Sequence, residues 1–190
     1  YLMEYCIPSL LSPNNIPALQ DKSRKNKFII CCPTNDWNKL EKHPTYQELK
    51  KFITPLHLDI PYPKSNKSHC DHMGIGHTLA TQYSFEDKAY LMALTPDLIL
   101  SDGTVKRAEY HAAQGKKIVF CAAIRFSEEG VLDQIKQFSS KEKPYLQLSG
   151  RDMVRIAAPN PHSETLTYDI DKRFLRPGSP IYFKRIDKVN

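Results

Sequence analysis

Two carboxylates follow an apolar run in the middle of the sequence, where a ligand site is expected. The run AYLMAL, residues 89–94, reads as a buried β-strand, and Asp97 comes directly after it in the loop TPD. Asp102 follows in a turn before the next expected helix. α/β proteins bind ligands in loops at the carboxyl ends of their strands. These acids can therefore hold a metal or a sugar, although both also suit plain turns, Asp97 after a proline and Asp102 before a glycine.

The densest group of possible metal ligands is HCDHMGIGH, residues 69–77. Structural zinc sites use such ligands, but they normally draw on two separated pairs. No second Cys or His pair at a recognisable spacing stands elsewhere in the sequence. Three interpretations stay open: a loop with a histidine at a helix start, substrate binding by His72 or His77, and a zinc-stabilised protein.

Strand and helix signals alternate around these residues. Continuous apolar runs are typical of parallel strands buried on both faces, and apolar residues three and four apart indicate helices. Their alternation predicts an α/β fold with an open, mostly parallel sheet and helices on both faces. We expect strands at 27–32, 55–63, 89–95 and 116–124, and helices at 1–11, 44–53, 77–85, 104–115, 127–138 and 149–157, with a turn-rich tail.

The composition is that of a soluble globular protein. Hydrophobic residues make up 41% and charged residues 25% of the 190 residues, which predicts one domain over residues 1–190. The start at Tyr1 indicates a fragment of, or a chain trimmed from, a longer protein. No apolar run approaches the ~20 residues that span a bilayer. Five cysteines, several of them in apolar runs, indicate reduced thiols and a cytoplasmic location.

The net charge of +6 favours anionic partners. The basic residues are scattered, apart from residues 22–27 and the pair at 116–117, and no aromatic RNA-binding signature accompanies them. We therefore expect no nucleic-acid partner. An amphipathic segment ahead of Tyr1 would allow peripheral membrane association of the basic surface.

Three familiar sequence motifs are missing. No GxGxxG follows the first expected strand, and neither GxxxxGK[ST] nor GxSxG occurs in the chain. Their absence argues against a dinucleotide-dependent dehydrogenase, a P-loop nucleotide hydrolase and an α/β serine hydrolase.

The stretch AYLMALTPDLILSDGTVKRAEYHAAQGKKIVF resembles GT-A-type glycosyltransferases, the nucleotide-diphospho-sugar transferase-like family. In that family a strand delivers a D-x-D motif, and a short strand, an sdG turn, a helix and another strand follow. Thr95 stands at the place of the first acid and Asp97 at the place of the last. SLLSPNNIPAL, SGRDMVRIAAPNPHSETL and RFLRPGSPIYF also resemble poorly characterised bacterial glycosyltransferase-like proteins, so the resemblance covers nearly the whole chain.

The resemblance implies a GT-A-like fold that binds a nucleotide-diphosphate sugar and transfers the sugar to an unknown acceptor, a saccharide, a lipid or a protein. It implies a divalent cation, Mn²⁺ or Mg²⁺, which prefers carboxylate oxygen. The departing diphosphate also needs cationic stabilisation. The implied metal ligands are Asp97 and His162, and the implied contacts to the donor are Thr34, Asp36, Asp102 and Arg125.

Each of these residues also has a structural interpretation. Thr95 in place of an acid favours the alternative of a non-catalytic nucleotide-sugar-binding or regulatory module on the same fold. Asp36 is also a preferred type of helix N-cap. Arg125 can pair with Glu128 or Glu129, and His162 can be an ordinary loop residue. The single tryptophan, Trp37, can cover a pocket or anchor the core, and we expect it in the core.

Overall fold

The computed structural model describes residues 1–19, 26–63, 69–121, 123–140, 142 and 144–169. Contacts within the chain divide it into two compact units. Unit 1 consists of residues 1–119 with 139–147, and unit 2 of residues 120–138 with 148–190. Most of the basic run at 22–27 and the expected extended pieces of the tail lie outside the described residues. The expectation of one domain over residues 1–190 stays a prediction.

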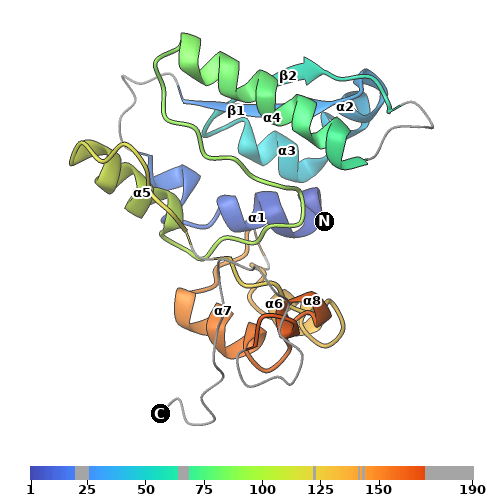
Figure 1. The fold of residues 1–190 in the computed structure, drawn as a ribbon, viewed down its shortest axis with the longest axis vertical. Coiled ribbons are helices and arrows are strands. Elements are labelled where there is room, and N and C mark those ends of the chain that lie inside the picture. Colours follow the sequence, from blue (N-terminus) through green and yellow to red (C-terminus); the bar gives the residue numbers. More distant parts are fainter. Residues whose placement is uncertain (20–25, 64–68, 122, 141, 143, 170–190) are drawn as a thin grey trace. The chain divides into compact units, whose positions relative to one another are not determined.

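Unit 1 contains a parallel pair of strands, β1 (Lys27–Cys32) and β2 (Thr54–Asp59) (Figure 1). Lys27 is paired with Thr54 at one end and Cys32 with Asp59 at the other. Parallel strands need a crossover connection, and here it contains the helices α2 (Thr34–Leu40) and α3 (Pro44–Leu49). The fold is therefore mixed α/β, and its parallel β-α-β unit lies at the expected place in the sequence.

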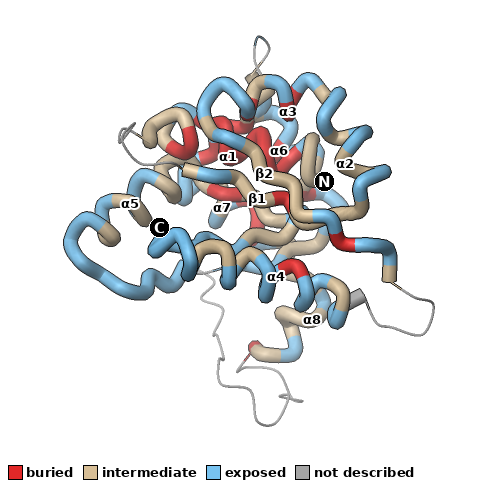
Figure 2. The backbone as a smooth tube through the Cα atoms, turned by 90° about the horizontal axis from the view of Figure 1, so that it is seen from above, coloured by how far each residue is buried: buried red, intermediate tan, exposed pale blue. Residues whose placement is uncertain are grey.

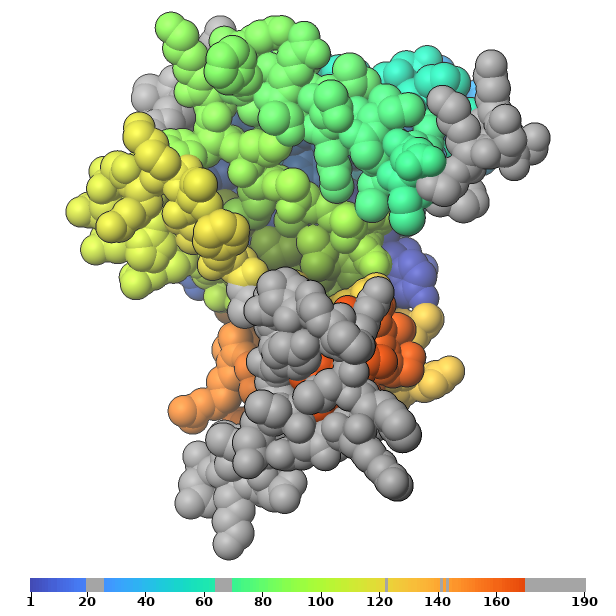
Figure 3. Space-filling view, in the orientation of Figure 1, coloured from blue at the N-terminus to red at the C-terminus, as the bar shows by residue number. Residues whose placement is uncertain are grey.

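Helices lie on both sides of this sheet. Figure 2 shows β1 and β2 between α4 (His69–Glu86) on one side and the helices α1 (Ile7–Leu10) and α3 on the other. The side chains of α4 also form an outer surface of unit 1 (Figure 3). Gly76 lies where α4 packs against the sheet: a Cβ atom built on it would be 3.1 Å from Cys31 Cβ and 3.3 Å from Ile60 Cδ1. The glycine therefore allows the close approach of helix and strand.

Two glycines of α4 provide a matched test of this packing. A Cβ on Gly74 meets nothing within 4 Å. Gly74→Ala should raise the free energy of unfolding by about 0.5–1 kcal/mol, because alanine is the better helix former. In Gly76→Ala the same gain is opposed by overpacking, so this variant should unfold about 1–2 kcal/mol more easily than Gly74→Ala. Urea unfolding of both variants measures the difference, and equal stabilities would contradict the close approach.

The N-terminal segment contributes most of the core of unit 1. It consists of a π-helical turn, η1 (Leu2–Cys6), continued by α1 (Ile7–Leu10), and a 3₁₀ turn, η2 (Ile16–Ala18). A further helix among the described residues of this unit is α5 (Thr104–Ala113). The buried cluster that joins these parts consists of Cys6, Ile7, Leu10, Leu11, Ile16, Leu49 and Leu100.

The described residues of unit 2 form three short helices, α6 (Leu132–Lys136), α7 (Gly150–Ala157) and α8 (Ser163–Leu166). A capping box starts α7, since Ser149 accepts from the Asp152 amide and Asp152 accepts from the Ser149 amide. Among the described residues of unit 2, the fully or nearly buried side chains are those of Val131, Ile135, Leu148, Ile156, Ala157 and Asp169.

Three expectations about the elements are wrong for the described residues. The runs at 89–95 and 116–124 form no strand in that part of the chain, and most of their described residues are exposed. An apolar run becomes a strand only where it finds a pairing partner, and the described ladder pairs β1 with β2 alone. The segment HCDHMGIGH is part of α4 and not a loop. One of its two glycines, Gly76, serves helix packing.

Candidate functional site

Polar side chains gather where β1 and β2 end. Asp59, the last residue of β2, accepts a hydrogen bond from the backbone amide of Thr34 (2.9 Å), so it ties the start of α2 to the neighbouring strand. Asp36, two residues further along α2, forms an ion pair with Lys39 (3.3 Å). We call Thr34, Asp36, His57, Asp59 and Tyr62 the strand-end cluster.

Aromatic rings stand beside these acids. Trp37 stacks on the imidazole of His57, with ring centroids 4.6 Å apart and an angle of 7° between the ring planes. Trp37 also packs edge to face against Tyr46, with ring centroids 5.4 Å apart. The His57 Nε2 atom lies 2.8 Å from the Cys32 carbonyl oxygen, which can only accept, so Nε2 carries the proton. The tryptophan is half-buried and lines the cluster, so it is not the core residue we expected.

The acids Asp36 and Asp59 affect the pKa values of neighbouring groups in the cluster. A hydrogen bond from the Tyr62 hydroxyl, with Lys39 assisting, lowers the pKa of Asp36, and the same bond raises the pKa of Tyr62. Burial, followed by the charges of Asp36, Cys31 and Asp59, raises the pKa of the Cys32 thiol to about 11. Cys32 therefore stays protonated at neutral pH. The cluster presents carboxylate acceptors and aromatic faces, and no thiolate nucleophile.

The second site expected from the sequence, the turn at residues 95–97, is also in unit 1. Asp97 is exposed, and one of its carboxylate oxygens accepts from the Thr95 hydroxyl at 2.5 Å. Behind the turn, the buried Cys6 thiol donates to the Thr95 carbonyl at 3.8 Å. Burial and then the charge of Asp97 raise the pKa of Cys6 to about 11. The acid therefore stands outward on a turn that rests on the N-terminal helix.

A buried polar network fixes the chain that follows Asp97. The side chain of Asn15 is fully buried, and its Nδ2 donates to the carbonyls of Ser9 (2.9 Å) and Ser101 (3.1 Å) and to the Ser12 hydroxyl (2.9 Å). Its Oδ1 accepts from the Val105 amide at 2.9 Å. The loop SPNN, which precedes β1, is thereby locked to the turn SDGT, more than 80 residues later in the chain.

Asp102 belongs to the same network. It accepts from the backbone amide and the side-chain amide of Asn14, both at 2.8 Å, and from Gln147 at 3.3 Å. These acceptor contacts serve the loop and leave little capacity for a ligand. The structure therefore places Asp102 as a loop anchor, and its predicted contact to the sugar donor has no support in this geometry.

Asp102 should make stability depend on acidity. Partial burial raises its pKa, but hydrogen bonds from Asn14, Ser12 and Gln147 outweigh that effect and hold the pKa below its usual value. A carboxyl whose pKa is lower in the folded state stabilises above its unfolded pKa, and the gain disappears as pH falls through the folded value. Asp102→Asn should lower the free energy of unfolding by about 1–3 kcal/mol near pH 7, because its NH₂ group would face the N–H donors of Asn14 and Gln147.

Urea unfolding at a series of pH values checks this expectation. The difference in unfolding free energy between the wild type and Asp102→Asn should shrink once the pH falls below about 4, near the usual value of an aspartate. If this difference in unfolding free energy stays constant over the pH range, the charge of the Asp102 carboxylate contributes nothing to stability.

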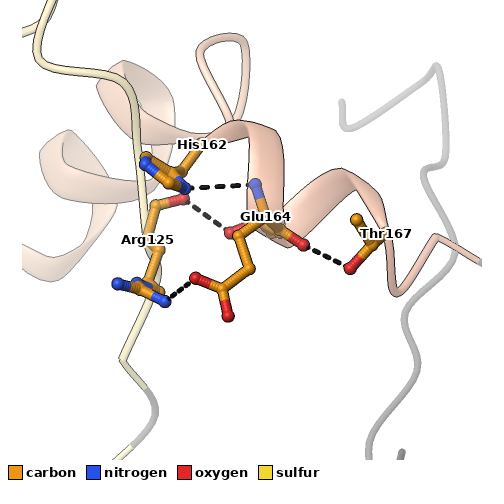
Figure 4. Close-up of polar contacts among 5 residues, drawn as sticks. Arg125, His162, Glu164 and Thr167 are labelled. Atoms are coloured by element: carbon orange, nitrogen blue, oxygen red, sulfur yellow. Dashed lines mark hydrogen bonds and ion pairs between the residues drawn. The ribbon is translucent and has the colours of Figure 1, made fainter. Parts of the chain in front are cut away.

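Arg125 and His162 meet in unit 2 (Figure 4). The Arg125 guanidinium pairs with Glu164, not with Glu128 or Glu129 as one interpretation proposed. The Arg125 carbonyl accepts from the His162 amide (3.1 Å) and from the Thr165 hydroxyl (3.1 Å). His162 is the N-cap of α8, since its Nδ1 accepts from the Glu164 amide at 3.1 Å. The arginine charge and one imidazole nitrogen thus serve the local structure.

The described residues bring together no group of three or more His, Cys, Asp and Glu side chains that could hold a metal. Within α4, Cys70 and His77 are two helical turns apart, about 10 Å along the axis, and cannot share one zinc ion. An open hollow of about 480 Å³ on this helix is lined by Cys70, Asp71, Gly74, Ile75, Thr78 and Leu79. Asp97 lies in unit 1 and His162 in unit 2, so their joint action on a cation stays a prediction.

Sequence reasoning missed His57, Asp59 and Tyr62 in the strand-end cluster. A signal was present, because Asp59 closes the second expected parallel strand and parallel strands end at the same edge of a sheet. The end of the second strand therefore carries the same signal as the end of the first.

The fold defines the class of the protein as mixed α/β with a two-stranded parallel sheet among the described residues. Comparison with protein-family models, with curated proteins and with solved structures found no match. None of the described helices is long and apolar enough to cross a membrane.

Proposed function

We propose that this chain is a glycosyltransferase-like protein that binds a nucleotide-diphosphate sugar and transfers the sugar to an acceptor. The observation that carries the proposal is the strand-end cluster. It combines acids and aromatic rings at the carboxyl ends of two parallel strands, the place where open α/β sheets bind ligands.

The chemistry of the cluster suits a nucleoside. The carboxylates of Asp36 and Asp59 can accept from ribose hydroxyls or from base N–H groups, and the Tyr62 hydroxyl is already oriented toward Asp36. Trp37 and Tyr62 offer aromatic surface against which a base can stack. Thr34 adds an exposed hydroxyl at the start of α2.

Asp97 suits the diphosphate end of the donor. Mg²⁺ and similar hard cations are commonly held by one or two carboxylates together with substrate phosphates and water. Asp97 is exposed and has one oxygen that the Thr95 hydroxyl does not occupy, so it fits such a cation. The cation would neutralise the charge that develops on the departing diphosphate. Arg125, which Glu164 already neutralises, is a weaker candidate for that task.

The alternative of a non-catalytic module rests on the same turn. The Thr95 hydroxyl, bonded to Asp97, stands where a second acid would supply another ligand to a cation. A site with one carboxylate can bind the nucleotide sugar without stabilising its leaving group enough for transfer. Release of free sugar from a bound donor discriminates between the two forms of the proposal.

Thermal unfolding against a panel of nucleotides and nucleotide sugars, with and without Mn²⁺ or Mg²⁺, tests the proposal. A ligand at 100 times its dissociation constant stabilises by about 2.7 kcal/mol, which corresponds to roughly 5–11 °C for a chain of this size. Asp36→Asn should weaken binding with or without metal, whereas Asp97→Ala should remove only the part that needs metal. Asp133→Ala, at an exposed carboxylate of α6, is the control. A flat response to the entire panel would refute nucleotide-sugar binding.

A further inference from the structure

The exposed face of α5 and the segment after it form a second surface that the proposed function does not use. The helix has no buried residue. Its exposed residues recur at helical spacing and include Lys106, Arg107 and Tyr110, while Glu109, the only acid of the helix, lies on the half-buried side. One face of α5 is therefore positively charged and free of carboxylates.

The chain turns back at the end of α5 and extends this face. Gly115 adopts a left-handed conformation (φ 77°), which favours glycine, and the Lys116 amide donates to the His111 carbonyl at 3.1 Å. Every residue from 113 to 119 is exposed. We call Lys106, Arg107, Tyr110, Lys116, Lys117, Ile118 and Val119 the α5 surface. Figure 3 shows α5 and the residues that follow it on an outer face of unit 1.

Cations and apolar side chains are mixed on this surface. Tyr110 is 52%, Ile118 71% and Val119 42% exposed, and Arg107 lies over the Tyr110 ring with 5.0 Å between its Cζ atom and the ring centroid. Among the described ion pairs, none includes a cation of this surface. An anionic partner would therefore be attracted by the positive charges, and an apolar partner would bury the exposed aliphatic groups.

We propose that the α5 surface binds the headgroup region of an anionic lipid membrane. Basic residues near such a membrane are attracted by its negative surface potential, and apolar side chains beside them enter the boundary between headgroups and acyl chains. A nucleic acid would satisfy the charges but would gain little from Ile118 and Val119, so the mixture favours lipid. The inference does not depend on nucleotide-sugar binding.

Co-sedimentation with vesicles tests the proposal. The wild-type chain should bind vesicles of phosphatidylcholine mixed with phosphatidylglycerol, should release them at high salt, and should not bind phosphatidylcholine alone. Lys116→Glu/Lys117→Glu should weaken binding by at least about tenfold. Lys42→Glu/Lys50→Glu changes the net charge equally at exposed positions of unit 1 outside the α5 surface, and should have a much smaller effect.

A second variant separates lipid from other polyanions. Ile118→Ser/Val119→Ser should weaken vesicle binding several-fold and leave retention on a heparin column unchanged, with circular dichroism confirming that the variant is folded. Absence of vesicle binding by the wild type overturns the proposal. Equal losses in the two lysine variants overturn it too, because they would reveal a general charge effect. Binding to nucleic acid without binding to vesicles would assign the surface to that partner instead.

Discussion

Replacing Asn15 with alanine is expected to lower the free energy of unfolding by about 4 kcal/mol. The side chain makes four hydrogen bonds and is fully buried. Each such bond contributes about 1 kcal/mol, and a partner left unsatisfied in the interior costs at least as much. Since small proteins are stable by only about 5–15 kcal/mol, this single change should remove a large share of the stability.

Urea unfolding measures the loss, with Asn38→Ala as the control. Asn38 is exposed on α2, and its replacement should change the free energy by less than about 0.5 kcal/mol. A loss below about 1 kcal/mol in Asn15→Ala would mean that water replaces the amide or that the two loops are not joined through it. Hydrogen exchange of the Val105 amide gives a second measure, because that amide loses its acceptor in the variant.

The Asn15 network marks the limit of what local sequence patterns can predict. The turn at SDGT was expected from the sequence, and both SPNN and SDGT contain turn residues in the structure. Nothing in either pattern indicates that one bonds to the other, because the residues involved are more than 80 positions apart. Turn propensity is a local property, whereas pairing of two turns depends on the fold that brings them together.

The same reasoning explains which elements were predicted. The expected strands at 27–32 and 55–63 correspond to β1 and β2, and the expected helices at 104–115 and 149–157 contain α5 and α7. Apolar periodicity sufficed for these four elements. It failed at 89–95 and 116–124, since a strand also needs a partner that the pattern does not name. The parallel arrangement is supported, but the GT-A topology stays a proposal.

The candidate site was predicted in part. The sequence pointed to Thr34 and Asp36, which lie at the strand ends, and to Asp97, which is exposed on its turn. Asp102 lies in a turn, as expected, and its carboxylate accepts hydrogen bonds from Asn14 and Gln147. Arg125 and His162 were chosen for a shared site with Asp97, but their polar groups are engaged with Glu164 and with the start of α8. Residue type predicts possible chemistry, and only neighbouring groups decide whether a side chain is available for it.

Thr95→Asp is expected to raise the affinity for Mn²⁺ by at least about tenfold. The Thr95 hydroxyl lies 2.5 Å from an Asp97 oxygen, so an aspartate there would bring two carboxylates together on one exposed turn. Two carboxylates a few ångström apart attract a divalent cation much more strongly than one does. The change restores the pair of acids that the resemblance to GT-A-type enzymes implies, and it needs no knowledge of the sugar or the acceptor.

Thermal unfolding separates cation binding from a change in the fold. Without metal, the like charges of Thr95→Asp should repel each other and lower the melting temperature by a few degrees, since about 1 kcal/mol corresponds to 2–4 °C in a chain of this length. Added Mn²⁺ should reverse the loss in this variant and have little effect on Thr95→Asn, which has the same shape without the charge.

The outcome decides what the turn at 95–97 is. A gain in Mn²⁺ affinity that also strengthens binding of a nucleoside diphosphate would make Asp97 part of a donor site whose strength Thr95 limits. A loss of stability that Mn²⁺ leaves unchanged would mean that the Asp97 carboxylate points away from any position a cation can share with residue 95. The role of Asp97 would then be structural: it would accept the hydrogen bond from Thr95 and so stabilise the turn that packs on Cys6. The strand-end cluster would remain the proposed nucleoside-binding site of unit 1, without a metal beside it.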